Sequence, residues 1–267
     1  MLCAKLRNFI AVGCFFLINT LSADLGHLNL QNDHQFWFEA VVHQKICKDV
    51  SLTLTTINDW GNDYSKYFFN YQAIGMEFDV MDKLLGKIDK KESLLKGVFF
   101  TVELARRNTI APSFPINKGG VVVSEVKWVT HNIPAIWALF FFGWRDWNYT
   151  LRTRLDYACP ESSHYGYSTQ FRLLQNLHSP WKYTKFKINP FIYNEGFYRG
   201  TNRNVGGLFD NRFRIGVQMS YAPLGKFFED VKADIYWQWR AIKQPIVAPR
   251  AYFYTYAIGI LIVKGIP

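Results

Sequence analysis

Beyond its first 23 residues, the chain has no apolar run long enough for a membrane-spanning helix. Such a helix needs about 20 consecutive apolar residues. The longest run, Ile133 to Trp144, is shorter and contains Pro134 and Gly143. This absence argues against a helical membrane bundle. Charged residues are also few, at 19% of 267, whereas hydrophobic residues make up 49%. That balance rules out an intrinsically disordered chain.

Several motifs of soluble enzymes and binding proteins are missing. The sequence has no phosphate-binding loop, no dinucleotide-binding fingerprint and no haem motif. Its 31 basic residues outnumber its 21 acidic ones, but they form no basic run typical of nucleic-acid binding. We therefore expect no cofactor and no nucleic-acid partner.

Cysteine is scarce. Cys47 and Cys159 are the only two beyond residue 23, and neither has a second Cys or a His at zinc-ligand spacing. We expect no metal site. The sequence leaves open whether these two cysteines pair.

Residues 1–23 have the pattern of a secretory signal peptide. Lys5 and Arg7 precede an apolar stretch from Phe9 to Ile18, and small residues end the segment at Ala23. The alternative is a buried N-terminal helix. With a signal peptide, 24–267 form one exported domain, because no linker divides the rest of the chain.

Residues alternate between apolar and polar with a period of two, which is typical of β-strands. Between Trp147 and Tyr157, for example, Leu151 and Leu155 alternate with Arg152 and Arg154. Clear alternation covers 49–55, 98–104, 147–157, 167–173, 212–221 and 231–240. Weaker alternation covers 35–44, 67–78, 121–130, 136–144, 183–193 and 251–263.

These segments predict an all-β fold of about twelve strands, with ten as the alternative. A soluble sandwich and a membrane barrel both alternate. The export signal favours the barrel, and so do the Trp and Tyr residues at strand ends, which are typical of interfacial girdles. These include Trp37, Trp60, Trp128, Trp144, Trp147, Tyr157 and Trp239. We predict an antiparallel up-and-down transmembrane β-barrel.

A set of short motifs in the second half supports this prediction. In order they are Leu151-Arg152-Thr153-Arg154-Leu155-Asp156-Tyr157, Phe171-Arg172-Leu173, Asn194-Glu195-Gly196-Phe197-Tyr198, Asp210-Asn211-Arg212-Phe213-Arg214-Ile215-Gly216 and Tyr236-Trp237-Gln238. Over about 145–263 the chain resembles an uncharacterised family of bacterial outer-membrane β-barrels, a domain of unknown function. The resemblance implies an outer-membrane barrel in a Gram-negative bacterium and no established catalytic residues. Such barrels usually end on an aromatic residue, whereas this chain ends Val263-Lys264-Gly265-Ile266-Pro267.

The polar faces of the predicted strands would line the barrel interior. Their charge network is the candidate site, with Arg152, Arg154, Asp156, Arg172, Glu195, Arg212 and Arg214. The wider inward set adds the bases Lys127, Lys185, Lys187, Lys232 and Arg240, and the acids Glu39, Asp49, Glu103, Glu125 and Asp234. The network could fill the barrel as paired charges, or a basic lining could attract small anionic solutes. Asp156 and Glu195 are the expected partners of the arginines.

We predict a structural or passive-transport (porin-like) outer-membrane protein with no catalysis. Its expected partners are outer-membrane lipids and the barrel-assembly machinery. One rival is a lipid-modifying hydrolase, for which Glu161, Ser162 and His164 offer the right residue types, although they fall in a turn. The other rival is a soluble periplasmic or secreted all-β binding protein.

Overall fold

The computed structural model describes residues 34–61, 66–85, 93–112, 116–118, 121–123, 126–161, 167–199, 207–243 and 252–265. The predicted signal peptide lies outside these residues, as do Ser162 and His164. Among the described residues, no helix is long and apolar enough to cross a membrane.

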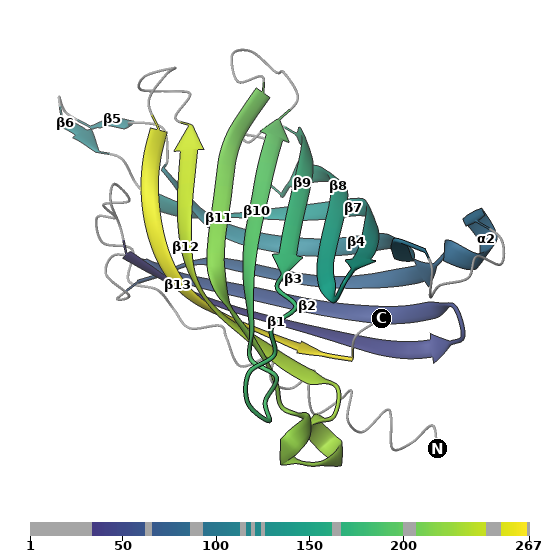
Figure 1. Cartoon of the computed structure of the whole chain (residues 1–267). Helices are drawn as coiled ribbons and strands as arrows, with labels where there is room; N and C mark the ends of the chain where they lie inside the picture. The colour runs from purple at the N-terminus through teal and green to yellow at the C-terminus, as the bar shows by residue number, and fades with distance from the viewer. Residues whose placement is uncertain are drawn as a thin grey trace.

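Eleven strands form a closed barrel (Figure 1). In barrel order they are β1 (His34–Cys47), β13 (Tyr252–Lys264), β12 (Val231–Lys243), β11 (Gly207–Ser220), β10 (Asn189–Arg199), β9 (Ser168–His178), β8 (Trp147–Pro160), β7 (Val126–Trp144), β4 (Leu95–Pro112), β3 (Lys66–Asp79) and β2 (Val50–Gly61). The predicted all-β barrel is confirmed. A two-stranded sheet of β5 (Ile116–Lys118) and β6 (Val121–Val123) interrupts the connection from β4 to β7, and short helices α2 (Met81–Leu85), η1 (Ala222–Leu224) and η2 (Lys226–Phe228) lie in other connections.

An odd number of strands makes the closing pair parallel. Ten neighbouring pairs are antiparallel, but β1 pairs with β13 in parallel, from His34 opposite Tyr256 to Val42 opposite Lys264. Purely antiparallel pairing was therefore wrong at this one seam. We call the end where β1 begins end A, and the end where β1 turns into β2 at Lys48 and Asp49 end B. Because β13 also runs towards end B, β1 begins at end A whereas β13 finishes at end B.

The strand count is eleven rather than twelve because 121–130 and 136–144 do not form two separate strands. Val126–Trp144 is one strand, which pairs continuously with β4 through Pro134. On its other side, the ladder to β8 includes Asn132 and Ala135 but omits the two residues between them, Ile133 and Pro134. Proline lacks an N–H donor and weakens a ladder on one side only. The strand therefore continues past this residue.

The segment 183–193 also differs from its prediction. Residues Tyr183 and Ile188 form an isolated antiparallel bridge within a tight hairpin, and β10 begins only at Asn189. Lys185 and Lys187 are exposed in this hairpin at end B rather than inside the barrel. Thr184 and Lys187 have positive φ angles of 64° and 50°, which an alternating strand pattern does not reveal.

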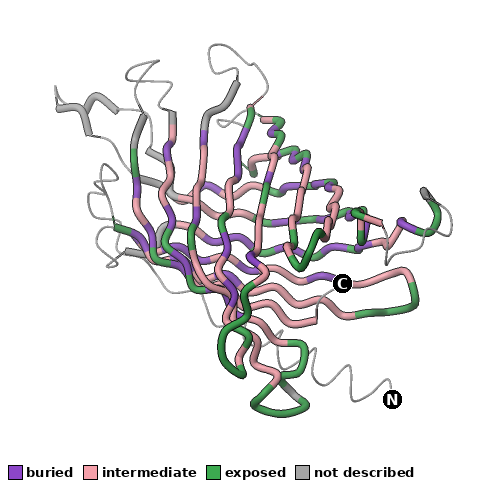
Figure 2. Tube along the Cα trace, in the orientation of Figure 1, coloured by how far each residue is buried: buried purple, intermediate pink, exposed green. Residues whose placement is uncertain are grey.

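Burial alternates along the strands (Figure 2). On β4, Thr101 and Glu103 are buried, whereas Val102 and Leu104 are exposed by 49% and 57%. The buried side chains point into the barrel and the exposed ones point outward. The fold thus turns its polar faces inward and its apolar faces outward, as predicted.

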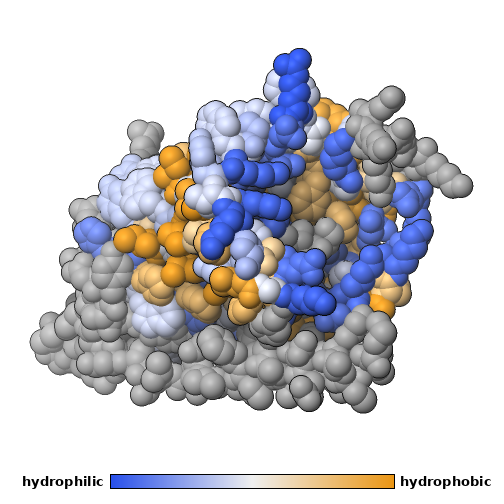
Figure 3. All heavy atoms as spheres, turned by 60° about the horizontal axis from the view of Figure 1, so that its bottom comes forward, coloured by the Kyte–Doolittle hydropathy of each residue, from blue (hydrophilic) through white to orange (hydrophobic). Residues whose placement is uncertain are grey.

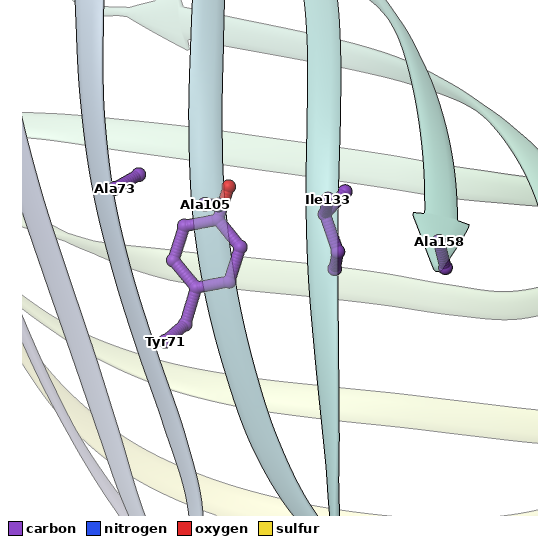
Figure 4. Packing of buried hydrophobic residues seen from close by; sticks show 5 residues of the cluster. All are labelled: Tyr71, Ala73, Ala105, Ile133 and Ala158. Carbon is purple, nitrogen blue, oxygen red and sulfur yellow. The ribbon is translucent and has the colours of Figure 1, made fainter. Parts of the chain in front are cut away.

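Part of the interior is filled by small apolar side chains. Tyr71, Ala73, Ala105, Ile133 and Ala158 form a cluster on neighbouring strands near end A (Figure 4). The alanines leave room for the ring of Tyr71, which is 4% exposed. The cluster thereby fixes Tyr71 beside the charged groups of the interior.

The two cysteines are free. Cys47 ends β1 at end B, whereas Cys159 lies near the end of β8 at end A. A disulfide requires Cα atoms within about 7 Å of each other, so these positions cannot pair in the closed barrel.

A glycine controls the position of one interior side chain. Gly216 and Gly259 lie opposite Tyr236 on the two neighbouring strands. A Cβ at Gly259 would collide with the Tyr236 ring. The glycine therefore lets this ring lie along the wall, from where its hydroxyl donates a hydrogen bond to Glu39 Oε1 at 2.6 Å.

We expect Gly259→Ala to lower the free energy of unfolding by about 1–3 kcal/mol, because the methyl group must displace the Tyr236 ring. Denaturant unfolding checks this. Gly143→Ala is the matched control, since its methyl group would meet only the flexible Lys96 side chain. Equal effects of the two substitutions would contradict the role given to Gly259.

Candidate functional site

Arg154 is the centre of one group of charges inside the barrel. Its side chain is only 5% exposed. The guanidinium lies 2.8 Å from Glu103 Oε1 and 2.6 Å from Asp156 Oδ1, and it donates a hydrogen bond to the Tyr71 hydroxyl at 2.5 Å. Arg172 lies 2.5 Å from the other oxygen of Asp156. Both arginines are thus neutralised by buried carboxylates.

Glu195 is the centre of a second group. Arg152 Nη2 donates to its Oε1 at 3.0 Å, and the hydroxyl of Tyr193 donates to its Oε2 at 2.8 Å. Arg212 Nη1 lies 3.9 Å from Oε2. Because Glu195 is only 2% exposed, its charge depends on these partners.

A third group joins β1 to β11 and β12. Arg214 lies 2.7 Å from Glu39 and donates a second hydrogen bond to Gln238 at 2.7 Å. Nearby, Asp210 accepts hydrogen bonds from Arg240, the shortest 2.7 Å long. Charge-assisted bonds of this kind are stronger than neutral ones.

Trp37 lies inside the barrel, which corrects its prediction as a girdle residue. Its side chain is 1% exposed, and its Nε1 donates a hydrogen bond to Gln35. The guanidiniums of Arg212, Arg214 and Arg240 lie 4.8, 5.7 and 5.8 Å from its ring. These distances are typical of cation–π contacts. The indole therefore serves as a second partner for one buried cation, Arg214, and two partly buried ones, Arg212 and Arg240.

These contacts form a closed circuit around the lumen in the half nearer end A. In order it joins Tyr71, Arg154, Asp156, Arg172, Phe197, Arg212, Trp37 and Phe69. The circuit begins and ends on β3 and passes through β8, β9, β10, β11 and β1. Trp37, Phe197 and Glu195 are each at most 2% exposed. Water therefore has almost no access beside these three side chains. We call the eight residues of the circuit, together with Glu195, the lumen layer.

The structure brings together all seven residues of the predicted network. Asp156 and Glu195 bind four of the five arginines, whereas the fifth, Arg214, binds Glu39. Of the wider set, Asp49 lies in the turn at end B and Lys232 near that same end. The side chains of Glu125 and Lys127 fall outside the described residues.

Sequence reasoning missed several aromatic side chains that lie inside the barrel beside these charges. Tyr71, Tyr193 and Phe197 are inward by alternation, so their position was available from the period of two. Alternation gives no sign of which inward residues meet across the lumen, because that depends on how the strands stagger around the barrel.

The comparisons with known proteins add no family. No family model and no curated protein matches the chain. The resemblance to an uncharacterised outer-membrane barrel family therefore stays a prediction. Among the described residues, no group of three or more His, Cys, Asp or Glu side chains is placed to hold a metal ion.

We expect Glu195→Gln to lower the free energy of unfolding by about 3 kcal/mol, because it leaves two guanidiniums without this carboxylate inside the barrel. Urea unfolding of the refolded protein measures the loss. Glu161→Gln is the matched control, because Glu161 and its partner Arg106 are 47% and 58% exposed. An exposed pair should contribute less than about 1 kcal/mol. A Glu195→Gln variant no less stable than the control would show that the network is not held by charge pairing.

Proposed function

We propose that this chain is a bacterial outer-membrane β-barrel whose lumen layer keeps it sealed, so that its role is structural rather than that of an open porin. The observation that carries the proposal is the outward apolar surface of a closed barrel. Among its exposed residues are Ile74, Val102, Leu104, Ile136, Leu155, Ile192, Ile215, Ile235 and Ile258. In water such a surface would promote aggregation, whereas in a bilayer it contacts lipid.

The spacing of aromatic residues on β8 supports a membrane of ordinary outer-membrane thickness. Its outward positions run from Trp147 through Leu151 and Leu155 to Tyr157. Ten residues cover about 33 Å along a strand. With a tilt of about 40°, this becomes about 25 Å along the barrel axis, which equals the usual apolar band.

Aromatic residues gather at both ends of the barrel. Near end A, Tyr157 stacks on Tyr167 and Trp239 on Tyr254. Near end B, Trp147 contacts Trp181, and Trp144 is 60% exposed. Belts of aromatic residues are expected where a barrel meets the two membrane interfaces. Figure 3, turned so that the bottom of Figure 1 comes forward, shows apolar and hydrophilic side chains next to each other on the face that it presents.

The lumen layer supports a sealed barrel. An open anion channel would require cations that face water. The guanidiniums of Arg154, Arg212 and Arg214 instead form ion pairs with carboxylates and, for Arg212 and Arg214, cation–π contacts with aromatic rings. The same pairing favours a non-catalytic role for these groups. The proposal includes contact with outer-membrane lipids and insertion by the barrel-assembly machinery.

Cell fractionation tests the location. We expect the protein in the outer-membrane fraction, with a gel mobility that changes on heating, as is usual for a stable barrel. Recovery in the soluble periplasmic or secreted fraction would overturn the proposal in favour of the soluble rival.

We expect Ile235→Arg to make folding into lipid vesicles less favourable by about 2–4 kcal/mol, because Ile235 lies on the outward face of β12 and is 43% exposed. Ile46→Arg, near the end-B terminus of β1, should cost less than about 1 kcal/mol although Ile46 is 60% exposed. Equal losses at the two positions would mean that the apolar surface does not face lipid.

A further inference from the structure

One inward arginine departs from the pairing that holds the others. Six guanidiniums inside the barrel each have a carboxylate oxygen within 3.4 Å, namely those of Arg152, Arg154, Arg172, Arg212, Arg214 and Arg240. Arg107 on β4 is also inward, because it continues the alternation of Glu103 and Ala105 and is only partly exposed. Within the described part of the chain, its guanidinium has no carboxylate at ion-pair distance, no hydrogen-bond acceptor and no aromatic ring, although its Nε is buried.

The strand ladders place His131 and Tyr71 beside Arg107. They are its direct partners on the two neighbouring strands, β7 and β3. Direct partners on one face of an antiparallel pair have Cβ atoms about 5 Å apart. His131 is inward because it continues the alternation of the buried Ile133, and its Nδ1 is also buried without a hydrogen-bond partner. A guanidinium and an imidazole that lack acceptors therefore lie next to each other.

Nearby acceptors serve other residues. The Tyr71 hydroxyl donates to Glu103 and accepts from Arg154. The two oxygens of Asp156 lie against Arg154 and Arg172. Because an enclosed cation without a partner is expensive, an anionic group from outside the chain would stabilise this place.

The pair faces end A. Since β4 runs towards end A, Arg107 lies four residues beyond Glu103 on that side, which is about 13 Å along the strand. On the end-B side the next inward residues are Ala105 and Ile133, which are 2% and 0% exposed (Figure 4). Arg107 and His131 are themselves partly exposed. A ligand can therefore reach them from end A without crossing the lumen layer.

We propose that Arg107 and His131 form a binding site for the carboxylate group of a small organic acid, on the end-A side of the barrel interior. A guanidinium offers two parallel N–H donors that match the two oxygens of a carboxylate, and the imidazole N–H is a third donor. One guanidinium beside an imidazole that is largely neutral above pH 7 balances a single negative charge. This favours a carboxylate over a phosphate, which carries close to two. The site goes beyond the proposed structural role and needs no open channel.

Sodium acetate is the probe, because it presents a carboxylate on the smallest carbon body. Calorimetric titration of the full chain, refolded in a maltoside detergent at pH 8 and constant ionic strength, should show saturable binding. Arg107→Gln and His131→Phe should each weaken it about tenfold, because each removes hydrogen bonds to a charged group.

Arg106→Gln is the matched control. Arg106 is the neighbouring residue on the same strand, but it points outward, is 58% exposed and lies 3.2 Å from Glu161. It should leave the affinity for acetate unchanged. Equal weakening by Arg106→Gln and Arg107→Gln would indicate diffuse attraction and overturn the site, as would the absence of saturable binding by the unaltered chain. Tighter binding of inorganic phosphate than of acetate would overturn the choice of a carboxylate.

Urea unfolding separates a ligand site from a structural role for Arg107. Without acetate, the unfolding midpoint of Arg107→Gln should be no lower than that of the unaltered protein, whereas Arg154→Gln, which breaks two ion pairs, should lower it. Acetate should raise the midpoint of the unaltered protein, because a ligand of the folded state stabilises that state, and should not change that of Arg107→Gln. A midpoint lowered as much by Arg107→Gln as by Arg154→Gln would contradict the proposal.

These measurements in detergent do not depend on where the protein resides in the cell. Their failure would leave the membrane proposal intact, and the reverse also holds.

Discussion

The pairing of buried guanidiniums with carboxylates and aromatic rings is the interaction on which this structure depends. A barrel that turns its apolar faces outward must place its polar faces inside, where charge without a partner is expensive. Arg154 meets this constraint through Asp156 on its own strand and Glu103 on β4, and Arg214 meets it through Glu39 on β1. The ion pairs that stabilise these buried charges also join strands that are not neighbours in the barrel.

Odd strand number and a sealed interior fit together. Parallel pairing of β1 with β13 closes the ring and places Glu39 within reach of Tyr236 and Arg214. Gly259 on the intervening strand lets the tyrosine ring pass. Closure of the barrel and filling of its lumen therefore share residues, and a change in one should disturb the other.

The period of two was enough to predict the strands and the two faces of each strand, because alternate residues lie in different environments. The choice of a barrel over a sandwich also needed the export signal and the aromatic residues at strand ends. Arg152, Arg154, Arg172, Arg212 and Arg214 were placed correctly on this basis. It was not enough for Trp37, since an aromatic residue near a strand end suits an interfacial girdle and a lumen equally well.

Other features required three-dimensional information. Pro134 suggests a break between two strands, yet the ladder to β4 continues through it. The hairpin around Lys187 has alternating residues but a left-handed backbone. Partners such as Arg214 and Glu39 depend on the stagger of strands that are far apart in sequence.

The central claim is that the lumen layer seals the barrel, and single-channel conductance in planar bilayers tests it most directly. The account predicts no resolvable current steps for the unaltered protein. It predicts steps for Trp37→Ala, which removes the ring that Arg212, Arg214 and Arg240 cover. Stable ohmic steps from the unaltered protein, with the same size in the Trp37→Ala variant, would contradict it.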